Sequence, residues 1–495
     1  KLISCSRVQS NHTVLNISLC ASERQEATIN SWTTCVIRQA VPKMSSQLLH
    51  HVEFCVGDGP KLVDMFLSKY HFKLHAVKQT ALSKQWVVKS GLINFLITQR
   101  LKVMPQIPSS GLWSDLIGVC RNDDFQSGLD EISNRMNVLS LPSAHVDGAD
   151  KVSVDEAFLM FCCNDKSEHT IDSAFNVSFE VKNVEKSVAR IEKNGGAVLR
   201  VPTMVKDEFG SVEYAIVKSC CGDVVHTIMN VNHYNGLFLP GFHPPSIKEL
   251  QQFDSRPRDE LTTHIDHITY VCNAGESAQI LDWYEKNFGM ERFATNEVDD
   301  PVEGLVIADD VNMRLRAMEY WPCAETGLNT NKPHGVMDPR FLRFVIAESL
   351  PDKVNKHIES FLVGHKGPGL QHIGLYTENM AKSVSMLYAN GVEFRQPPPT
   401  YYTGVGKLDE ILSCGEDIEM MKELGILMDA ELDGPQQDRG TNKYLLQIFT
   451  HPMFGEETFF MELIKRRGAQ GFGSGNVTAL ARSIDYYNKM IKQTH

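Results

Sequence analysis

Residues 371–394 read QHIGLYTENMAKSVSMLYANGVEF, and residues 175–198 read FNVSFEVKNVEKSVARIEKNGGAV. Aligned without a gap, the two stretches place Asn183 on Asn379 and share a Lys-Ser-Val triplet and an Asn-Gly pair. Each is typical of a short alternating strand, a polar turn, an amphipathic helix and a second strand. We therefore expect an internal repeat of one strand–helix–strand unit.

A second pair of similar stretches extends the repeat. HHVEFCV (50–56) and DHITYVC (266–272) each precede an apolar-periodic helix. The chain therefore holds two copies of a unit built from two βα-plus-strands modules. Short strands bounded by Gly, Pro and Asn, with helices between them, favour an α+β fold with curved sheets that pair into open barrels, rather than a doubly wound parallel sheet.

The repeat predicts the domain boundaries. Residues 1–43 form a Ser/Thr-rich extension outside the fold, 44–244 the N-terminal domain, 245–260 a polar linker and 261–495 the C-terminal domain. Residues 318–340 and the acidic stretch 404–442 are predicted to be insertions between strands of the C-terminal domain, the latter a partly disordered surface loop.

Composition excludes several classes of function. The 495 residues carry a formal net charge of −12 and no basic cluster, which argues against nucleic acid as a partner. No run of about 18 apolar residues is present, so no membrane span is expected. The adjacent pairs Cys162–Cys163 and Cys220–Cys221 lack the CxxC spacing of zinc or redox motifs, so they are interpreted as ordinary reduced thiols.

Three polar residues lie on predicted strands of the C-terminal copy. His267 belongs to HIDHITYV, His372 to GLQHIGLY and Glu462 to TFFMELIKR. Singly, each is more often a hydrogen-bonded histidine or an ion-paired glutamate. Together, two histidines and a carboxylate with open positions left over are the ligand set of non-haem Fe(II) oxygenases. In the N-terminal copy His51 matches His267, but Asn176 replaces His372, so we expect that this copy has lost its metal site.

The C-terminal half resembles the 4-hydroxyphenylpyruvate dioxygenase family, which has the vicinal-oxygen-chelate fold. The resemblance rests on DHITYV, GLQHIGLYTENM, YLLQIFTHPMF and TFFMELIKRRGAQGFGSGN, with YNGLFLPGF at the end of the first half. It implies two tandem vicinal-oxygen-chelate domains, each of paired βαβββ modules around a central site, with Fe(II) on His267, His372 and Glu462. The implied substrates are O₂ and 4-hydroxyphenylpyruvate, whose 2-oxo acid group would occupy two of the open iron positions.

The resemblance also assigns the surroundings of the iron. The implied catalytic residues are Gln371, Gln447 and Asn476; the implied substrate-binding residues are Phe449, Phe460, Phe472, Val477, Val345 and Ala347. The family further implies a homodimer, and its animal paralogue implies a mitochondrial location, with the cytoplasm as the alternative.

The chain departs from the homogentisate-forming members at the pocket. Val477 stands where they carry Phe after the QGFGxGN motif. In VIAES (345–349), aligned with their PLNEP-type strand, Val345 replaces Pro and Ala347 replaces Asn, and His357 stands where a Gln is expected. Hydroxymandelate synthases depart at the same positions. Because a displacement of about 1 Å can redirect such a reaction, we expect benzylic hydroxylation to 4-hydroxymandelate, with homogentisate of tyrosine catabolism as the alternative.

Two other functions stay open at this point. An extradiol catechol dioxygenase shares the fold and the ligand set, although the paired glutamines argue against it. A non-catalytic regulatory protein that retains the fold is also consistent with an altered pocket. The glycine-rich GFGSGNVTAL (471–480) lacks the GxGxxG spacing and the P-loop lysine, so it predicts a loop and helix that close over the metal rather than a phosphate site.

Overall fold

The computed structural model describes residues 48–80, 83–101, 172–253, 258–293, 300, 302–307, 311–320, 343–431, 443–454, 458–480, 482, 483 and 486. The predicted extension 1–43 lies outside these residues. So do residues 321–340 and 432–442 of the two predicted insertions.

The first half of the chain forms a single eight-stranded sheet in the order β2-β3-β4-β1-β5-β8-β7-β6. The central strands β1 and β5 pair antiparallel, and each pairs in parallel with the last strand of its own module. Two βαβββ modules therefore join side by side. The strands are β1 Leu48–Val56, β2 Lys73–Gln79, β3 Ser83–Ser90, β4 Ile93–Arg100, β5 Ser173–Glu180, β6 Val198–Asp207, β7 Gly210–Lys218 and β8 Val225–Asn230.

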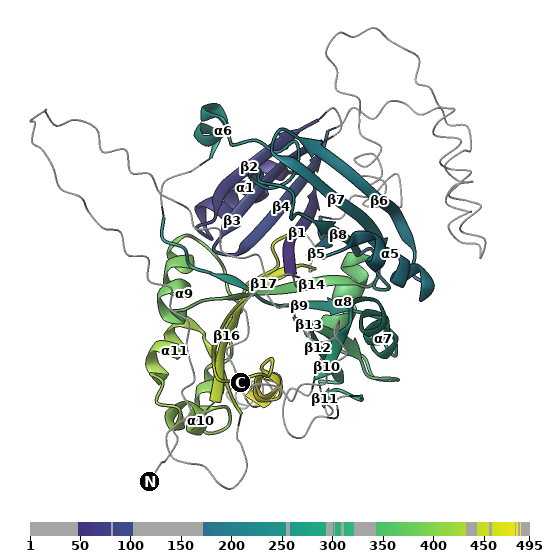
Figure 1. The fold of residues 1–495 in the computed structure, drawn as a ribbon. Helices are drawn as coiled ribbons and strands as arrows, with labels where there is room; N and C mark the ends of the chain where they lie inside the picture. The colour runs from purple at the N-terminus through teal and green to yellow at the C-terminus, as the bar shows by residue number, and fades with distance from the viewer. Residues whose placement is uncertain are drawn as a thin grey trace, which may run out of the picture. The chain divides into compact units, whose positions relative to one another are not determined.

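The second half repeats this topology in the order β10-β12-β13-β9-β14-β17-β16-β15, with the short β11 on β12 (Figure 1). Here β9 and β14 are the central antiparallel pair. The predicted α+β fold of paired modules is thus confirmed. The strands are β9 His264–Val271, β10 Met290–Phe293, β11 Leu305–Ile307, β12 Met313–Tyr320, β13 Arg343–Ser349, β14 Gly369–Tyr376, β15 Leu427–Glu431, β16 Lys443–Phe449 and β17 Phe460–Arg467.

Each module has a helix after its first strand, and most of these helices begin at an Asn or Asp cap. The side chains of Asp58, Asn183 and Asn379 each accept a hydrogen bond from the backbone N–H three residues on. A cap of this kind satisfies one of the free N–H groups of the first turn. The shared Asn183 and Asn379 of the repeat are therefore equivalent caps. The helices are α1 Gly59–Ser68, α5 Val184–Lys193, α7 Ser277–Phe288 and α9 Met380–Ala389.

The break between the sheets falls between β8 and β9, the interval that includes the predicted linker 245–260. Its described part contains the short helix α6 (Ile247–Gln252), which begins with a capping box between Ser246 and Glu249. A further helix, α8 (Lys356–His365), connects β13 to β14.

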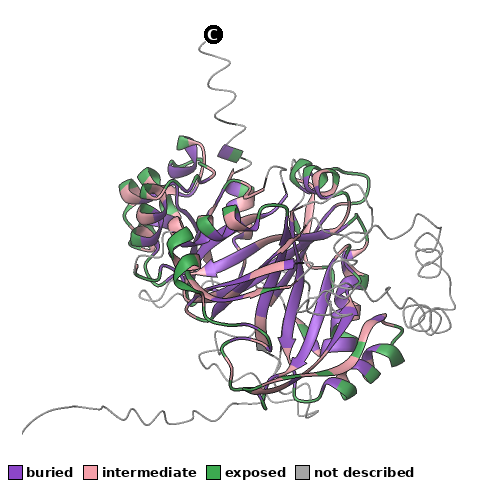
Figure 2. Ribbon diagram, turned by 90° about the horizontal axis from the view of Figure 1, so that it is seen from above, coloured by how far each residue is buried: buried purple, intermediate pink, exposed green. Residues whose placement is uncertain are grey.

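The two halves share one apolar core. Phe54 of β1 packs edge-on against Phe459, 5.3 Å between ring centroids, and Phe179 of β5 packs against Phe344 of β13 at 6.3 Å. The central strands are mostly buried, whereas exposed residues occur on the helices and on edge strands such as β6 (Figure 2). No helix in the described part of the chain is long and apolar enough to cross a membrane.

The stretch 404–442 differs from its prediction as a loose insertion. Its described part folds into α10 (Leu408–Ser413), α11 (Ile418–Leu424) and the edge strand β15, which pairs with β16 over its whole length. The acidic composition was misleading because two of its carboxylates, Asp429 and Glu431, accept backbone hydrogen bonds inside the fold.

Candidate metal centre

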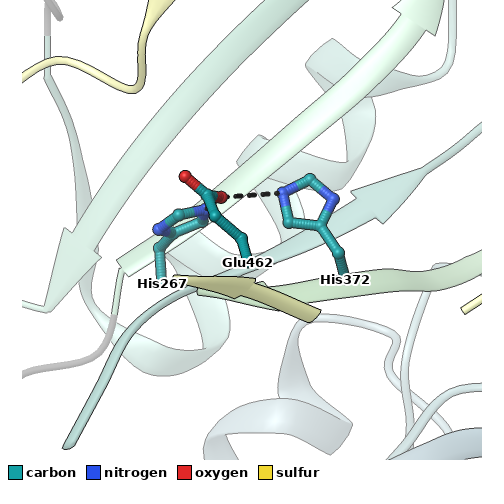
Figure 3. Close-up of side chains that lie close together, drawn as sticks. All are labelled: His267, His372 and Glu462. Carbon is teal, nitrogen blue, oxygen red and sulfur yellow. Dashed lines mark ion pairs between the residues drawn. The ribbon is translucent and has the colours of Figure 1, made fainter. Parts of the chain in front are cut away.

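His267, His372 and Glu462 converge from three adjacent central strands, β9, β14 and β17 (Figure 3). Each offers one ligand atom, and these atoms all lie within 4.8 Å of one another. The Glu462 Oε2 atom is 3.1 Å from His267 Nε2 and 3.6 Å from His372 Nε2. The structure thus brings together the three residues predicted as metal ligands.

A glycine provides the room for this arrangement. Gly374 lies opposite both His267 on β9 and Glu462 on β17. A Cβ at Gly374 would overlap the imidazole of His267. The absence of a side chain therefore lets the His267 ring lie across β14 and reach the carboxylate.

Two β-bulges orient the imidazoles. The register between β9 and β14 shifts once at Gln371 and once at Asp266, so each of these residues has no partner on the opposite strand. An unpaired residue in a bulge can aim its side chain differently from the regular alternation. As a result, Asp266 Oδ1 lies 2.9 Å from His267 Nδ1, and Gln371 Oε1 lies 3.1 Å from His372 Nδ1.

These hydrogen bonds determine which ring nitrogen faces the centre. With Nδ1–H donating to the neighbouring oxygen, the Nε2 atom of each histidine points toward Glu462. A partner of this kind is the usual support of a metal-binding histidine, because it fixes both tautomer and ring orientation.

The electrostatics of the two histidines differ. Burial lowers the pKa of His267, but the Glu462 and Asp266 carboxylates outweigh it and raise that pKa to about 9. Burial, together with the nearby His267, holds the pKa of His372 well below its usual value. Without a metal, the buried carboxylate is thus balanced by a proton on His267.

The donor set fits a metal ion with open coordination positions. Two ligands at about 2.1 Å from a metal and at right angles are about 3 Å apart, close to the 3.1 and 3.6 Å separations around Glu462 Oε2. Glu462 is 2% exposed, and a buried carboxylate is costly unless it is paired or bound to a cation. His₂–carboxylate is the donor set typical of non-haem Fe(II).

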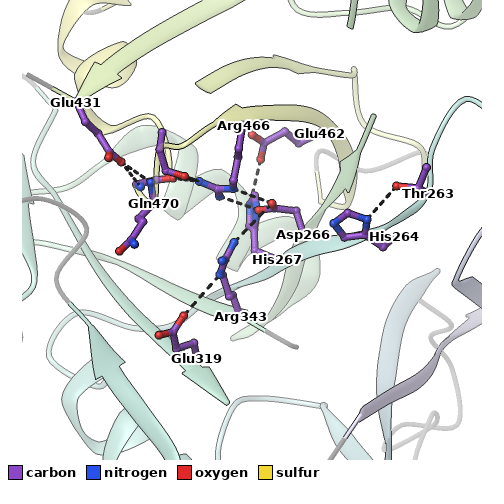
Figure 4. Close-up of polar contacts among 12 residues, drawn as sticks. Thr263, His264, Asp266, His267, Glu319, Arg343, Glu431, Glu462, Arg466 and Gln470 are labelled. Carbon is purple, nitrogen blue, oxygen red and sulfur yellow. Dashed lines mark hydrogen bonds and ion pairs between the residues drawn. The ribbon is translucent and has the colours of Figure 1, made fainter. Parts of the chain in front are cut away.

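A buried ion-pair network lies behind His267 (Figure 4). The Arg466 guanidinium donates to both oxygens of Asp266, from Nε and Nη2, at 2.7 Å each. Arg343 lies 3.7 Å from Asp266 Oδ2 and 3.7 Å from Glu319. Burial raises the pKa of Asp266, but Arg466 more than compensates and holds it well below its usual range.

The same arginine reaches the loop that follows β17. Arg466 Nη1 donates to the carbonyl oxygens of Ala469 and Gly471, and its guanidinium lies 5.1 Å from the centre of the Phe472 ring. Phe472 in turn packs against His267, 5.0 Å between ring centroids. Arg466 therefore connects the orientation of His267 to the loop that follows β17.

Aromatic rings line the other side of the centre. Phe460 stacks on the His372 ring, 4.7 Å between centroids and 19° between planes. Phe449 stands edge-on to His372 at 6.4 Å and to Phe460 at 6.1 Å. The three phenylalanines predicted to bind substrate, Phe449, Phe460 and Phe472, thus lie around the two histidines.

The predicted amides Gln447 and Asn476 are buried beside the closing loop, residues 468–476. Gln447 Oε1 and Asn476 Nδ2 have no hydrogen-bond partner among the residues that the structure describes, whereas Asn476 Oδ1 accepts from the Tyr401 hydroxyl at 2.6 Å. Buried polar atoms without partners are uncommon in folded proteins. They are candidates for contact with a bound ligand.

Strand β15 anchors the closing loop. The backbone N–H groups of Gln470 and Gly471 donate to Glu431 Oε1 at 2.6 Å, and that of Gly475 donates to Asp429 Oδ2 at 3.0 Å. Residues 474–480 are helical. The N-terminal end of this helix carries a partial positive charge, which also stabilises the Asp429 carboxylate beside it.

The remaining predicted residues lie on β13, on α8 and on the helix that follows the closing loop. Val345 pairs across strands with Thr269, on the face that carries His267. Ala347 packs instead with Val271 and with Ile358 and Phe361 of α8. Val477 is half-buried in the first turn of the final helix, and His357 is exposed on α8.

Sequence reasoning missed Asp266, Arg466 and Thr269. Arg466 follows Glu462 by four residues, so strand periodicity alone could have placed it on the same face. Asp266 could not be found this way because its orientation depends on a bulge. Thr269 is 2% exposed and lies directly opposite His372, and its hydroxyl has no hydrogen-bond partner in the described part of the chain.

Comparison with known proteins agrees with the fold. Residues 264–409 match the model of the Glyoxalase/Bleomycin resistance protein/Dioxygenase superfamily. A triple mutant of 4-hydroxymandelate synthase from Streptomyces coelicolor superposes with a TM-score of 0.59, covering 90% of this chain and 100% of that one. Its sequence is 20% identical, so the likeness supports the fold alone.

Relatives of higher identity identify the family. The chain is 33% identical to the human 4-hydroxyphenylpyruvate dioxygenase-like protein over 360 residues, which cover 70% of this chain and 88% of that protein. It is 32% identical to the 4-hydroxyphenylpyruvate dioxygenase of Yarrowia lipolytica, covering 63% of this chain and 72% of that enzyme. On this shared sequence and fold, the chain belongs to the 4-hydroxyphenylpyruvate dioxygenase family.

Proposed function

We propose that this chain is an Fe(II)-dependent dioxygenase that converts 4-hydroxyphenylpyruvate and O₂ to a hydroxylated aryl acid and CO₂. The observation that carries the proposal is the convergence of His267, His372 and Glu462 in a centre lined by aromatic rings. Bound there, Fe(II) would supply chelation of the 2-oxo acid and activation of O₂.

The protein's own groups would hold and orient the reactants. Asp266 and Gln371 keep both imidazoles aimed at the metal. The rings of Phe449, Phe460 and Phe472 would pack against the aryl group and exclude water.

The unpaired amide atoms suit the polar ends of such a substrate. Gln447 Oε1 would accept a hydrogen bond from a substrate hydroxyl, and Asn476 Nδ2 would donate one. Satisfying such buried atoms adds affinity, because each is otherwise desolvated without compensation.

Two products remain candidates for the same reaction. Val477 favours 4-hydroxymandelate, since a small side chain replaces an aromatic one at the pocket. The relative from Yarrowia lipolytica is named 4-hydroxyphenylpyruvate dioxygenase, which fits homogentisate instead. The overall equation is the same for both: one oxygen atom of O₂ enters the carboxyl group left after CO₂ departs, and the other becomes the new hydroxyl.

Oxygen consumption tests the proposal directly. The purified chain is loaded anaerobically with Fe(II), mixed with 4-hydroxyphenylpyruvate and O₂, and its products are separated against authentic 4-hydroxymandelate and homogentisate. With 4-hydroxyphenylpyruvate we expect oxygen uptake and release of CO₂. With catechol we expect no oxygen uptake. Uptake with catechol alone would favour an extradiol dioxygenase, and no turnover of an iron-loaded protein would contradict the proposal.

A further inference from the structure

The N-terminal sheet carries a partly open cavity of its own, of about 220 Å³. Its lining comes from strands β1 to β8 and from the segment around Pro240 that covers the sheet. The cavity therefore lies within one half of the molecule and is separate from the metal centre.

The repeat relates this cavity to the metal centre. His51 corresponds to His267 and Asn176 to His372 in the aligned repeat, and all four are buried or half-buried. Strand pairing supplies the third correspondence: Asn176 pairs with Val225 as His372 pairs with Phe460, so Thr227, two residues on, takes the place of Glu462.

An amide and a hydroxyl thus replace two of the three ligands at equivalent positions. These groups bind metal ions weakly, but they make good hydrogen bonds. In this half Asn176 Nδ2 donates to Thr227 Oγ1 and to Glu53 Oε2, at 2.9 Å each, so the ionisable groups beside them are the ones left to recognise a ligand.

Two side chains that can carry opposite charges, Glu53 and Lys78, line the cavity. Glu53, 2% exposed, accepts hydrogen bonds from Thr98 Oγ1 at 2.7 Å and from Asn176 Nδ2 at 2.9 Å. Each carboxylate oxygen can accept a second hydrogen bond. The Lys78 ammonium lies over the Phe242 ring, 5.6 Å from its centre, and both residues belong to the lining.

Most of the remaining wall is apolar. Val212, Ile216, Met229 and Leu239 contribute hydrocarbon side chains from β7, β8 and the covering segment. A ligand that combines an apolar body with one positive and one negative group would match this lining.

We propose that the N-terminal cavity binds a free α-amino acid with an apolar side chain, whose ammonium donates to Glu53 and whose carboxylate pairs with Lys78. The side chain then packs against Val212, Ile216 and Met229. This binding is independent of the proposed oxygenase reaction and needs no metal.

Calorimetric titration of the metal-free full chain tests this site. The probes are L-phenylalanine, phenethylamine, which lacks the carboxylate, and 3-phenylpropionate, which lacks the ammonium. We expect one molecule of L-phenylalanine per chain, and binding weaker by roughly tenfold or more for each singly charged analogue, because a buried charge loses its partner.

Variants locate the bound amino acid. Lys78→Met and Glu53→Gln should each weaken L-phenylalanine binding roughly tenfold or more. Lys73→Met, on the same strand but 57% exposed, should leave it unchanged, as should Glu462→Gln at the metal centre. If Glu53→Gln fails to fold, Lys78→Met still tests the proposal. The Lys78 side chain is only partly buried, so replacing it should leave the fold intact.

The outcomes that overturn the proposal are distinct from failure of the oxygenase assay. Absence of binding by folded wild-type chain, equal affinity in Lys78→Met, or loss of binding in Glu462→Gln each contradicts it. A chain without oxygenase activity that still binds L-phenylalanine at Lys78 would support it.

Discussion

Gly473 lies so close to Gln447 that a Cβ at this glycine would overlap the side-chain amide. The closing loop and the amide of β16 therefore fit together only because position 473 carries no side chain. Gly473 also has a φ of +74°, in the left-handed region that favours glycine. The contact connects the QGFGxGN motif directly to the candidate site.

Gly473→Ala should impair the site more than the fold. The methyl group pushes the end of a flexible glutamine side chain, so Gln447 turns away and the rate of aryl-acid formation falls, roughly tenfold or more. Gly415→Ala is the matched control, because Gly415 has a φ of +72° with nothing within 4 Å of an added Cβ. Both variants should lose about 1 kcal/mol of unfolding free energy from backbone strain. A wild-type rate in Gly473→Ala would show that this contact is not needed.

Metal should stabilise the chain through Glu462. Fe(II), or Co(II) as an air-stable substitute, binds the folded state and should raise the melting temperature, with about 2.7 kcal/mol gained at a hundredfold excess over Kd. Chelation reverses the shift. Glu462→Gln should abolish the metal-dependent rise in melting temperature, because the amide brings no negative charge. Glu393 is exposed, so Glu393→Gln should retain the rise. A metal-dependent shift that persists in Glu462→Gln would exclude this ligand set.

Arg466 should act as a positioning residue for His267. In Arg466→Gln, Asp266 loses its bidentate partner, so the imidazole is held less firmly and metal affinity falls by roughly 10- to 100-fold. Arg467→Gln removes the neighbouring arginine, which is 55% exposed, and should have no such effect. Isothermal titration with Co(II) gives the affinities. Arg466→Lys keeps the positive charge but loses the planar guanidinium, so it should recover part of the affinity. Equal affinities in Arg466→Gln and Arg467→Gln would rule out this role.

Val477 should influence which aryl acid forms. In Val477→Phe a bulky ring enters the first turn of the final helix and restricts where the aryl group can move, so the product ratio should shift toward homogentisate. Val477→Leu, which adds volume without a flat ring, is the control. Chromatography of the two products gives the ratio. An unchanged ratio in Val477→Phe would mean that this position does not select the product.

Glu348 should contribute a pH-dependent part of the stability. Its buried carboxylate accepts from the N–H groups of Gly275 and Ser277 at the start of α7 and from Arg314 and Arg316. Burial raises the pKa of Glu348, but the hydrogen bonds from Ser277 and the two arginines lower it below 4.5. A lowered folded-state pKa means that the contribution is complete above about pH 4.5 and is lost as the pH falls through the folded-state value.

Urea unfolding of Glu348→Gln tests this pH dependence. The variant should lose about 2–3 kcal/mol at pH 7, since Arg314 and Arg316 lose the buried carboxylate that they share. The difference from wild type should shrink in acid. A difference that grows as the pH falls would reverse the assigned sign.

The sequence alone determined the repeat, the fold class and the three predicted ligands. Strand periodicity of two residues and helix periodicity of 3.6 are local properties, and the Asn183 and Asn379 caps can be recognised within four residues. The motifs around His267, His372 and Glu462 also lie in short stretches. Duplication made the strand, helix and cap signals stronger, because these appear in both copies.

Only the tertiary structure decided how the ligands are supported. Asp266 and Gln371 reach their histidines because the pairing of β9 with β14 shifts register at both residues. Arg466 meets Asp266 from 200 residues away, and β15, expected to be part of a loop, holds the closing loop through Asp429 and Glu431. Register, bulges and contacts between distant strands depend on how all strands of the sheet pair. A local stretch of sequence does not determine this pairing.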